Sequence, residues 1–182
     1  MNIQREIYYA SNLISIFRLV LLVPVSWLMI NSFESKNTLI LVLVLCMYFS
    51  DLLDGYLARK LNQVSEFGKI IDPLADKICV IVICLILLYL GKIPLWFVAI
   101  VVLRDVFILA FGVYLNQKKD LRLMSNYPGK IAVFSIGLVI LFSIIDSPVL
   151  HEINNYLYFI CLALILYSSL LYFKRFQNSV KE

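Results

Sequence analysis

The sequence predicts an all-α integral membrane protein. The prediction rests on its apolar composition and on a series of long apolar runs. Of the 182 residues, 62% are hydrophobic and only 15% are charged, and the mean hydropathy is +0.91. A soluble domain of this length could not bury so much apolar surface. The apolar residues form runs of about 20, the length that a helix needs to cross a bilayer. With no Ser/Gly/Pro-rich linker and no repeat, we expect a single membrane domain over residues 1–182.

Six apolar runs follow one another, and polar or helix-breaking residues separate the later ones. About eight residues separate the second run from the third, and the turn 91–94 separates the third from the fourth. The polar segment 117–127 and the Asp-Ser-Pro break at 146–148 divide the rest. The expected transmembrane helices are 11–30, 38–59, 68–90, 94–116, 128–145 and 153–173.

Basic residues between these helices predict their orientation. Two of them, Lys36 and Lys92, fall on one side of the membrane, and three, Arg18, Lys77 and Arg104, lie inside helices. The other eleven fall on the opposite side: Arg5, Arg59, Lys60, Lys69, Lys118, Lys119, Arg122, Lys130, Lys174, Arg175 and Lys181. Because basic loops stay in the cytoplasm, we expect both termini there, in a bacterial-type plasma membrane. The net charge of +4 then reflects this bias and anionic lipids, not nucleic-acid binding.

Four aspartates lie where the second and third apolar runs approach each other. Asp51 and Asp54 share a helix face at i and i+3, and Asp72 and Asp76 share one at i and i+4. A short connection makes the two helices antiparallel neighbours, so the four carboxylates can converge. Such acids are costly in a membrane and repel one another unless cations bind them. Oxygen-only ligands favour Mg²⁺ or Mn²⁺, two ions being common in phosphoryl chemistry, and Arg59 is placed to meet a phosphate.

Two other interpretations of these acids stay open. A single buried aspartate could simply pair with Lys77, Arg18 or Arg104, and we expect Arg18 to cap or brace the acidic site. Intramembrane carboxylates also mark the pathways of cation-coupled transporters. A transporter is disfavoured because no second half of the chain mirrors the acidic pair.

The segment from Asp51 to Asp76 resembles the signature of the CDP-alcohol phosphotransferase family. That signature, D-x2-D-G-x2-A-R-x8-G-x3-D-x3-D, matches at all eight fixed positions and in the eight-residue spacer. The resemblance implies six spans, a possible homodimer, and transfer of a substituted phosphoryl group from a CDP-linked lipid to an alcohol with release of CMP. It implies metal ligation by Asp51, Asp54, Asp72 and Asp76, with Asp76 also the base. It implies contacts to the CDP-lipid from Asp54, Gly55, Ala58, Arg59 and Gly68.

Further strings resemble one branch of this family. The sequence Asp-Pro-Leu-Ala-Asp-Lys at 72–77 and the opening helix with Asn12 and Arg18 are similar to phosphatidylglycerophosphate synthases and CDP-diacylglycerol-using cardiolipin synthases. The pair Arg104-Asp105 is closer to the cardiolipin synthases. The acceptor expected first is glycerol 3-phosphate, with phosphatidylglycerol or another alcohol as alternatives. The candidate cations for an acceptor phosphate are Lys130, Arg104 and Arg122, although each also fits a plain role as anchor, buried ion-pair partner or loop charge.

The remaining reactive residues have plain interpretations. The single histidine, His151, is expected near the outer end of the last helix, away from the aspartates. Four cysteines, Cys46, Cys79, Cys84 and Cys161, fall inside apolar runs without zinc-type spacing, and we expect buried thiols.

Overall fold

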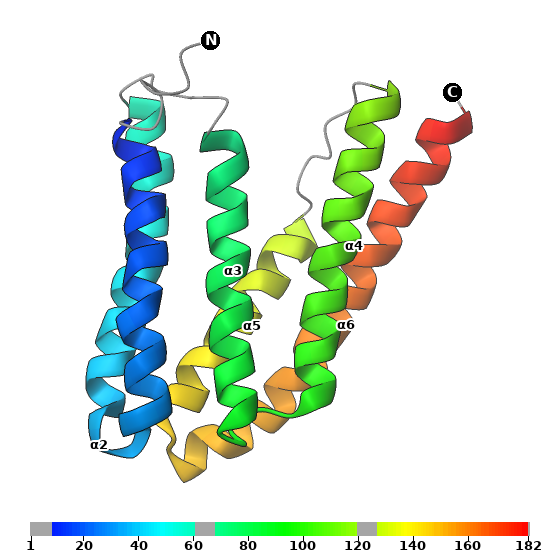
Figure 1. The fold of residues 1–182 in the computed structure, drawn as a ribbon. Coiled ribbons are helices and arrows are strands. Elements are labelled where there is room, and N and C mark those ends of the chain that lie inside the picture. The colour runs from blue at the N-terminus through cyan, green and yellow to red at the C-terminus, as the bar shows by residue number, and fades with distance from the viewer. Residues whose placement is uncertain (1–8, 61–67, 120–126, 182) are drawn as a thin grey trace. The chain divides into compact units, whose positions relative to one another are not determined.

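The computed structural model describes residues 9–60, 68–119 and 127–181, and these residues form helices without any strand, which confirms the all-α prediction. The chain divides into two compact units, Met1–Leu90 and Gly91–Glu182. The helices, labelled in Figure 1, are α2 (Ala10–Lys60), α3 (Gly68–Tyr89), α4 (Leu95–Lys119), α5 (Tyr127–Ile145) and α6 (Pro148–Lys181).

Helix α2 contains the first two expected transmembrane helices as one element with a sharp reversal. The backbone leaves helical geometry at Ser32, where φ is −147°, and at Lys36, where φ is −129°. Figure 1 shows the chain folding back there, so that two arms run in opposite directions. This agrees with the expected separate helices at 11–30 and 38–59, because both departures from helical geometry fall between those ranges. Between Ser32 and Lys36 the backbone is helical, so the connection between the two arms is short.

The first arm of α2 has one buried face and one exposed apolar face. Deep in the unit, the buried face consists of Leu22, Val25 and Met29. The exposed face repeats every three or four residues, as expected for a helix turned toward lipid. Its members include Leu13, Phe17, Val20, Val23, Trp27 and Ile30.

Helix α3 packs against α2 and completes the first unit. Its buried residues Ala75, Cys79, Ile83 and Leu87 recur every fourth position, so one stripe of the helix faces α2. The helix ends at Tyr89, and Gly91 follows with φ of +70°, a conformation that glycine adopts without steric cost.

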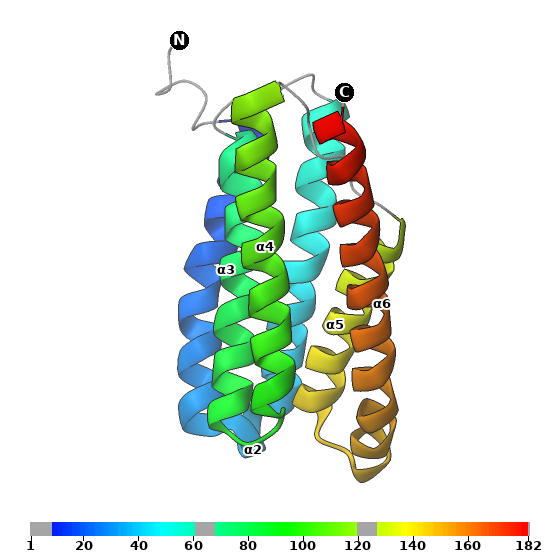
Figure 2. The same ribbon diagram turned by 90° about the vertical axis from the view of Figure 1, so that its right-hand side faces the viewer.

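The second unit begins with a turn that starts α4. The carbonyl of Pro94 accepts the first helical hydrogen bonds, from the amides of Phe97 at 3.1 Å and Val98 at 3.4 Å. Helix α4 contacts α6, and α5 packs extensively against α6. Figure 2 shows α6 as the longer of the last two helices, running past the start of α5.

The start of α6 corrects one predicted boundary. We expected the last helix to begin at 153, with the Asp-Ser-Pro sequence at 146–148 acting as a break. The helix begins instead at Pro148, and the carbonyl of Ser147 accepts a bond from the amide of His151 at 2.9 Å. Proline fits the first turn of a helix because its missing N–H is not needed there. The break is confined to Asp146 and Ser147, and Asp146, with φ of 55°, directly follows the end of α5.

Three helices in the described part of the chain are long and apolar enough to cross a membrane. They are Asn12–Ser50, Tyr127–Ile145 and Pro148–Leu171. The first has 39 residues, about twice the length that one crossing needs. The structure is thus that of an integral membrane protein.

The cysteines follow the same division between buried and exposed faces. Cys79, Cys84 and Cys161 are buried free thiols, as predicted. Cys46 is exposed, which corrects the expectation that all four are buried. It lies on the same helix face as Val42 and Phe49, both exposed apolar residues of the second arm, so its thiol lies on an exposed apolar face of the helix.

Candidate functional site

The predicted acidic motif occupies the end of α2 and the beginning of α3. The backbone is helical at Asp51 and Asp54 and again at Asp72 and Asp76, so each pair has the helical spacing that the sequence predicts. Among the motif's acids, Asp76 is the one whose side chain the structure describes. The structure does not describe the other side chains named for this site, so their roles stay predictions. They are those of Asp51, Asp54, Gly55, Ala58, Arg59, Gly68 and Asp72.

Asp76 is held by an arginine from the first arm of α2. The Nη1 group of Arg18 donates to Oδ1 of Asp76 and forms an ion pair with it. The two partners differ sharply in exposure, because the side chain of Arg18 is 4% exposed and that of Asp76 is 42% exposed. The cation is therefore enclosed in the unit, while the carboxylate remains accessible from outside. The expectation that Arg18 braces the acidic site is confirmed for Asp76.

A short polar stripe on α2 surrounds this arginine. Asn12, Ser15 and Arg18 are all buried, and their spacing of three residues places them on one helix face. Ser15 Oγ accepts a hydrogen bond from Nη2 of Arg18 at 3.3 Å. Farther along the same side of the arm the buried residues are apolar, starting with Leu22. Among the described residues of the first unit, the buried polar side chains are therefore those of the first turns of α2, where Arg18 reaches Asp76.

The candidate cations for an acceptor lie in the second unit and differ in how they are bound. Nη1 of Arg104 donates to Oδ1 of the adjacent Asp105 at 2.7 Å, and both side chains are largely buried. Nε of Arg104 is also buried, without a hydrogen-bond partner among the described residues. The Lys130 residue is exposed, with its ammonium 5.9 Å from the centroid of the Tyr127 ring. Arg122 lies outside the described residues.

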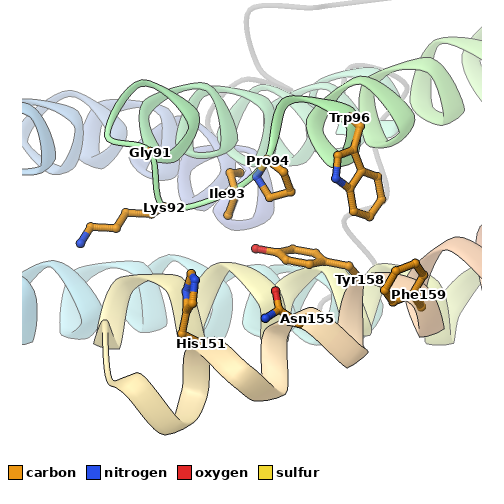
Figure 3. Close-up of a pocket in the computed structure, with 9 residues that line it drawn as sticks. All are labelled: Gly91, Lys92, Ile93, Pro94, Trp96, His151, Asn155, Tyr158 and Phe159. Carbon is orange, nitrogen blue, oxygen red and sulfur yellow. The ribbon is translucent and has the colours of Figure 1, made fainter.

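A cavity of about 460 Å³, which sequence analysis did not predict, lies between the turn before α4 and the first half of α6. Figure 3 shows His151 and Asn155 pointing from α6 toward that turn, and the Tyr158 ring lying lengthwise between α6 and the turn. Lys92 extends away from Trp96 and Phe159. Nζ of Lys92 instead donates to Oδ2 of Asp146 at 2.5 Å. His151 is exposed and lines this cavity. No sequence signal marks the cavity, because its residues are ordinary for the end of a membrane helix.

Comparison with known proteins agrees with the motif. A family model described as CDP-alcohol phosphatidyltransferase matches residues 8–169. A protein of Aquifex aeolicus named CDP-diacylglycerol–glycerol-3-phosphate 3-phosphatidyltransferase is 34% identical over 179 residues, covering 94% of this chain and 98% of that protein. A Bacillus subtilis protein of the same name is 36% identical over 97 residues, 51% of this chain and 50% of its own length.

A second name occurs among the relatives. A probable cardiolipin synthase (CMP-forming) of Drosophila melanogaster is 36% identical over 102 residues, which is 56% of this chain and 31% of that protein. The chain therefore aligns with nearly all of the Aquifex protein but with only about a third of the Drosophila one.

Proposed function

We propose that this chain, which belongs to the CDP-alcohol phosphatidyltransferase family, transfers the phosphatidyl group of CDP-diacylglycerol to glycerol 3-phosphate and releases CMP. The observation that carries the proposal is the motif from Asp51 to Asp76, which matches at all eight fixed positions and is set in two helices. Glycerol 3-phosphate is favoured as acceptor because the Aquifex aeolicus protein, which aligns with this chain along nearly the whole of its own length, carries that substrate in its name.

Two divalent cations, Mg²⁺ or Mn²⁺, fit the donor set that the motif supplies. Asp51, Asp54, Asp72 and Asp76 offer only carboxylate oxygens, which hard cations prefer. The exposure of Asp76 leaves its carboxylate accessible although Arg18 holds it. When bound, the cations supply charge neutralisation to the diphosphate and to the departing CMP.

The protein's own residues carry the other parts of the proposed reaction. Asp76 accepts the proton of the acceptor hydroxyl, whose oxygen forms a new bond to the lipid-linked phosphorus as the bond to the CMP oxygen breaks. Arg59 contacts the diphosphate through its fork of donors. Asp54, Gly55, Ala58 and Gly68 line the place of the CDP-lipid. The lipid tails stay in the bilayer while the nucleotide reaches water.

We further propose six membrane crossings with both termini and the acidic motif on the cytoplasmic side of a bacterial-type plasma membrane. The sharp reversal at Ser32 and Lys36 divides the 39-residue span Asn12–Ser50 into two arms, each about long enough for one crossing. The eleven-to-two distribution of basic residues favours this orientation. A homodimer is part of the same proposal, by analogy with the family.

A second acceptor has its own support. Several relatives are named cardiolipin synthases, and the Arg104-Asp105 pair resembles the sequence of that branch at this position. Phosphatidylglycerol is therefore the alternative acceptor. Both candidate acceptors carry a phosphate. The proposed role of Lys130, Arg104 and Arg122, which is to bind that phosphate, is therefore the same with either acceptor.

The deciding experiment measures CMP release from CDP-diacylglycerol by the purified protein with Mg²⁺. Glycerol 3-phosphate and phosphatidylglycerol are supplied separately, and a chelator provides the metal control. We expect chelator-sensitive release with glycerol 3-phosphate, and none from a folded Asp76→Asn variant, which lacks the proposed base. Release with phosphatidylglycerol alone would transfer the assignment to cardiolipin synthesis. Full activity of Asp76→Asn would refute the proposed mechanism.

A further inference from the structure

We propose that Arg18 is the positioning residue for the proposed base: its guanidinium holds the Asp76 carboxylate in the orientation that accepts the proton of the acceptor hydroxyl. The inference rests on the proposed function, because it assigns Arg18 a part in that same reaction. The ion pair between Nη1 of Arg18 and Oδ1 of Asp76 is the contact that carries it.

The contrast in exposure within this pair gives the first reason. Arg18 is enclosed and Asp76 is accessible, so the cation lies on the inner side of the carboxylate. A base must present an oxygen to its substrate while the rest of the side chain is fixed, because rotation of a carboxylate about its terminal bonds is otherwise nearly free. A cation that binds Oδ1 from the interior restrains that rotation and leaves the outer side of the group to a substrate.

The way in which Arg18 is itself held gives the second reason. Arginine has a long side chain with many rotamers, so it can position a partner only where its own conformation is restricted. Here it is buried, and its Nη2 donates to Ser15 Oγ one turn earlier on α2. The guanidinium is thus fixed on its own helix by one nitrogen and reaches α3 with the other, across 58 positions of sequence.

The location of the polar stripe gives the third reason. Asn12, Ser15 and Arg18 are buried polar residues on an arm whose deeper interior is apolar. Buried polar groups in a membrane helix are costly unless they are partnered and used. A contact between two helices can be built from apolar residues alone, and the buried residues farther along this arm, such as Val25 and Met29, are apolar. The charge is placed instead at the one described carboxylate of the motif.

A purely structural ion pair is the competing explanation, and the two make different demands. A structural pin contributes to folding and leaves the turnover of the folded protein unchanged. A positioning residue lowers kcat without changing the affinity for the CDP-lipid or for the metal. A metal-assembling residue, in contrast, would change the affinity for the ion.

The test compares Arg18→Gln with Arg18→Lys, which retains the charge but loses the fork of donors. For each variant we would measure kcat, the KM for CDP-diacylglycerol, Mn²⁺ binding by electron paramagnetic resonance, and thermal unfolding. We expect Arg18→Gln to lower kcat by about 100-fold, the lower range of what a positioned base contributes. The KM and the Mn²⁺ affinity should change by no more than about threefold, well under the tenfold that 1.4 kcal/mol represents. Arg18→Lys should recover part of the lost kcat.

Two further variants make the result specific. Lys92→Gln is the matched control, because it also removes a cation from an ion pair, with Asp146, but outside the motif; its kcat should equal that of the wild type. Ser15→Ala removes the 3.3 Å contact that holds Arg18 and should lower kcat several-fold. If Arg18→Gln does not fold, Ser15→Ala and Arg18→Lys decide the question in its place.

The outcomes separate the inference from the proposed function. Unchanged kcat in folded Arg18→Gln, with a lowered unfolding temperature, would leave only a structural pair and overturn the inference. Loss of Mn²⁺ binding would overturn it too, since Arg18 would then act on the metal site. If the wild-type protein released no CMP with any acceptor, the proposed function would fail first and the inference with it.

Discussion

Lys130 and Arg104 show at the level of single residues how two candidate cations can be told apart. Arg104 already donates to Asp105 at 2.7 Å, so much of its charge is balanced within the protein. Lys130 is exposed beside the Tyr127 ring, and no carboxylate of the described residues pairs with it. An exposed lysine can offer three donors to a phosphate without first breaking an internal ion pair. Lys130 is therefore the better first candidate for the acceptor phosphate.

We predict that Lys130→Ala raises the KM for the acceptor by about tenfold, corresponding to about 1.4 kcal/mol for one lost charge-assisted hydrogen bond. The KM for CDP-diacylglycerol should stay within about twofold of the wild-type value, because the proposed CDP-lipid contacts come from the acidic motif. Steady-state kinetics with each substrate varied in turn measures both constants. Equal increases in the two KM values would exclude Lys130 from acceptor binding.

The sequence predicts side-chain partners most specifically when they are near each other in it. The Arg104–Asp105 pair joins adjacent residues and was one of the alternatives that the sequence left open. Arg18 was expected to brace the acidic site, but three basic residues could equally have paired with a lone aspartate. The choice of Asp76 depends on how α2 and α3 pack across 58 positions, which helical periodicity does not encode. The contact of Ser15 with Arg18 has a weak signal, its position one turn before the arginine.

At the level of elements, the contact between α5 and α6 contains a small buried hydrogen-bond network. Asn154 is 1% exposed, and its Nδ2 donates to Ser143 Oγ at 3.1 Å and to the Val139 carbonyl at 3.4 Å. The Ser143 hydroxyl in turn donates to the same carbonyl at 2.8 Å. Hydrogen bonds between membrane helices stabilise by only about 0.6 kcal/mol on average and up to about 1.7. The network therefore specifies how the helices pair more than it stabilises them.

We predict a coupling free energy of about 0.6 to 1.7 kcal/mol between Ser143→Ala and Asn154→Leu in a double-mutant cycle. The free energy of unfolding would be measured in lipid–detergent micelles for the wild type, both single variants and the double variant. Ser169→Ala serves as the control, because Ser169 is an exposed residue of the same helix; with Asn154→Leu its effect should be additive. A coupling energy indistinguishable from that of the control would show that the network contributes nothing to the pairing.

Helix positions were largely predictable, and the errors have identifiable physical causes. Expected helices at 68–90 and 128–145 agree with α3 and α5 to within a residue or so, because long apolar runs with clear ends leave little choice. The sequence predicts the start of the last helix five residues too late, because Pro148 fits a break in the chain as well as the first turn of a helix. The reversal within α2 falls at Ser32 and Lys36, between the predicted helices 11–30 and 38–59, although no Gly or Pro marks it in the sequence.

The whole molecule displays the apolar surface that the sequence demands of a membrane protein. Large hydrophobic side chains are exposed in both units, among them Phe17 and Trp27 in the first and Phe134 and Phe159 in the second. In water such surfaces would aggregate, whereas hydrocarbon solvates them. The composition predicted this surface, but orientation depends on which loops remain in the cytoplasm, and only the basic residues carry that information.

Orientation yields the last prediction, tested with single cysteines in a variant from which Cys46, Cys79, Cys84 and Cys161 have been removed. Lys36→Cys and Lys92→Cys should react with a membrane-impermeant maleimide in intact cells, because both positions are proposed to face outward. Lys119→Cys should react only after the membrane is permeabilised, since it belongs to the basic side. This test needs no activity assay, because labelling directly reports the side of the membrane on which each cysteine lies. Labelling of Lys119→Cys in intact cells, with protection of the other two, would invert the proposed topology and place the acidic motif outside, where no cytoplasmic CDP-diacylglycerol headgroup could reach it.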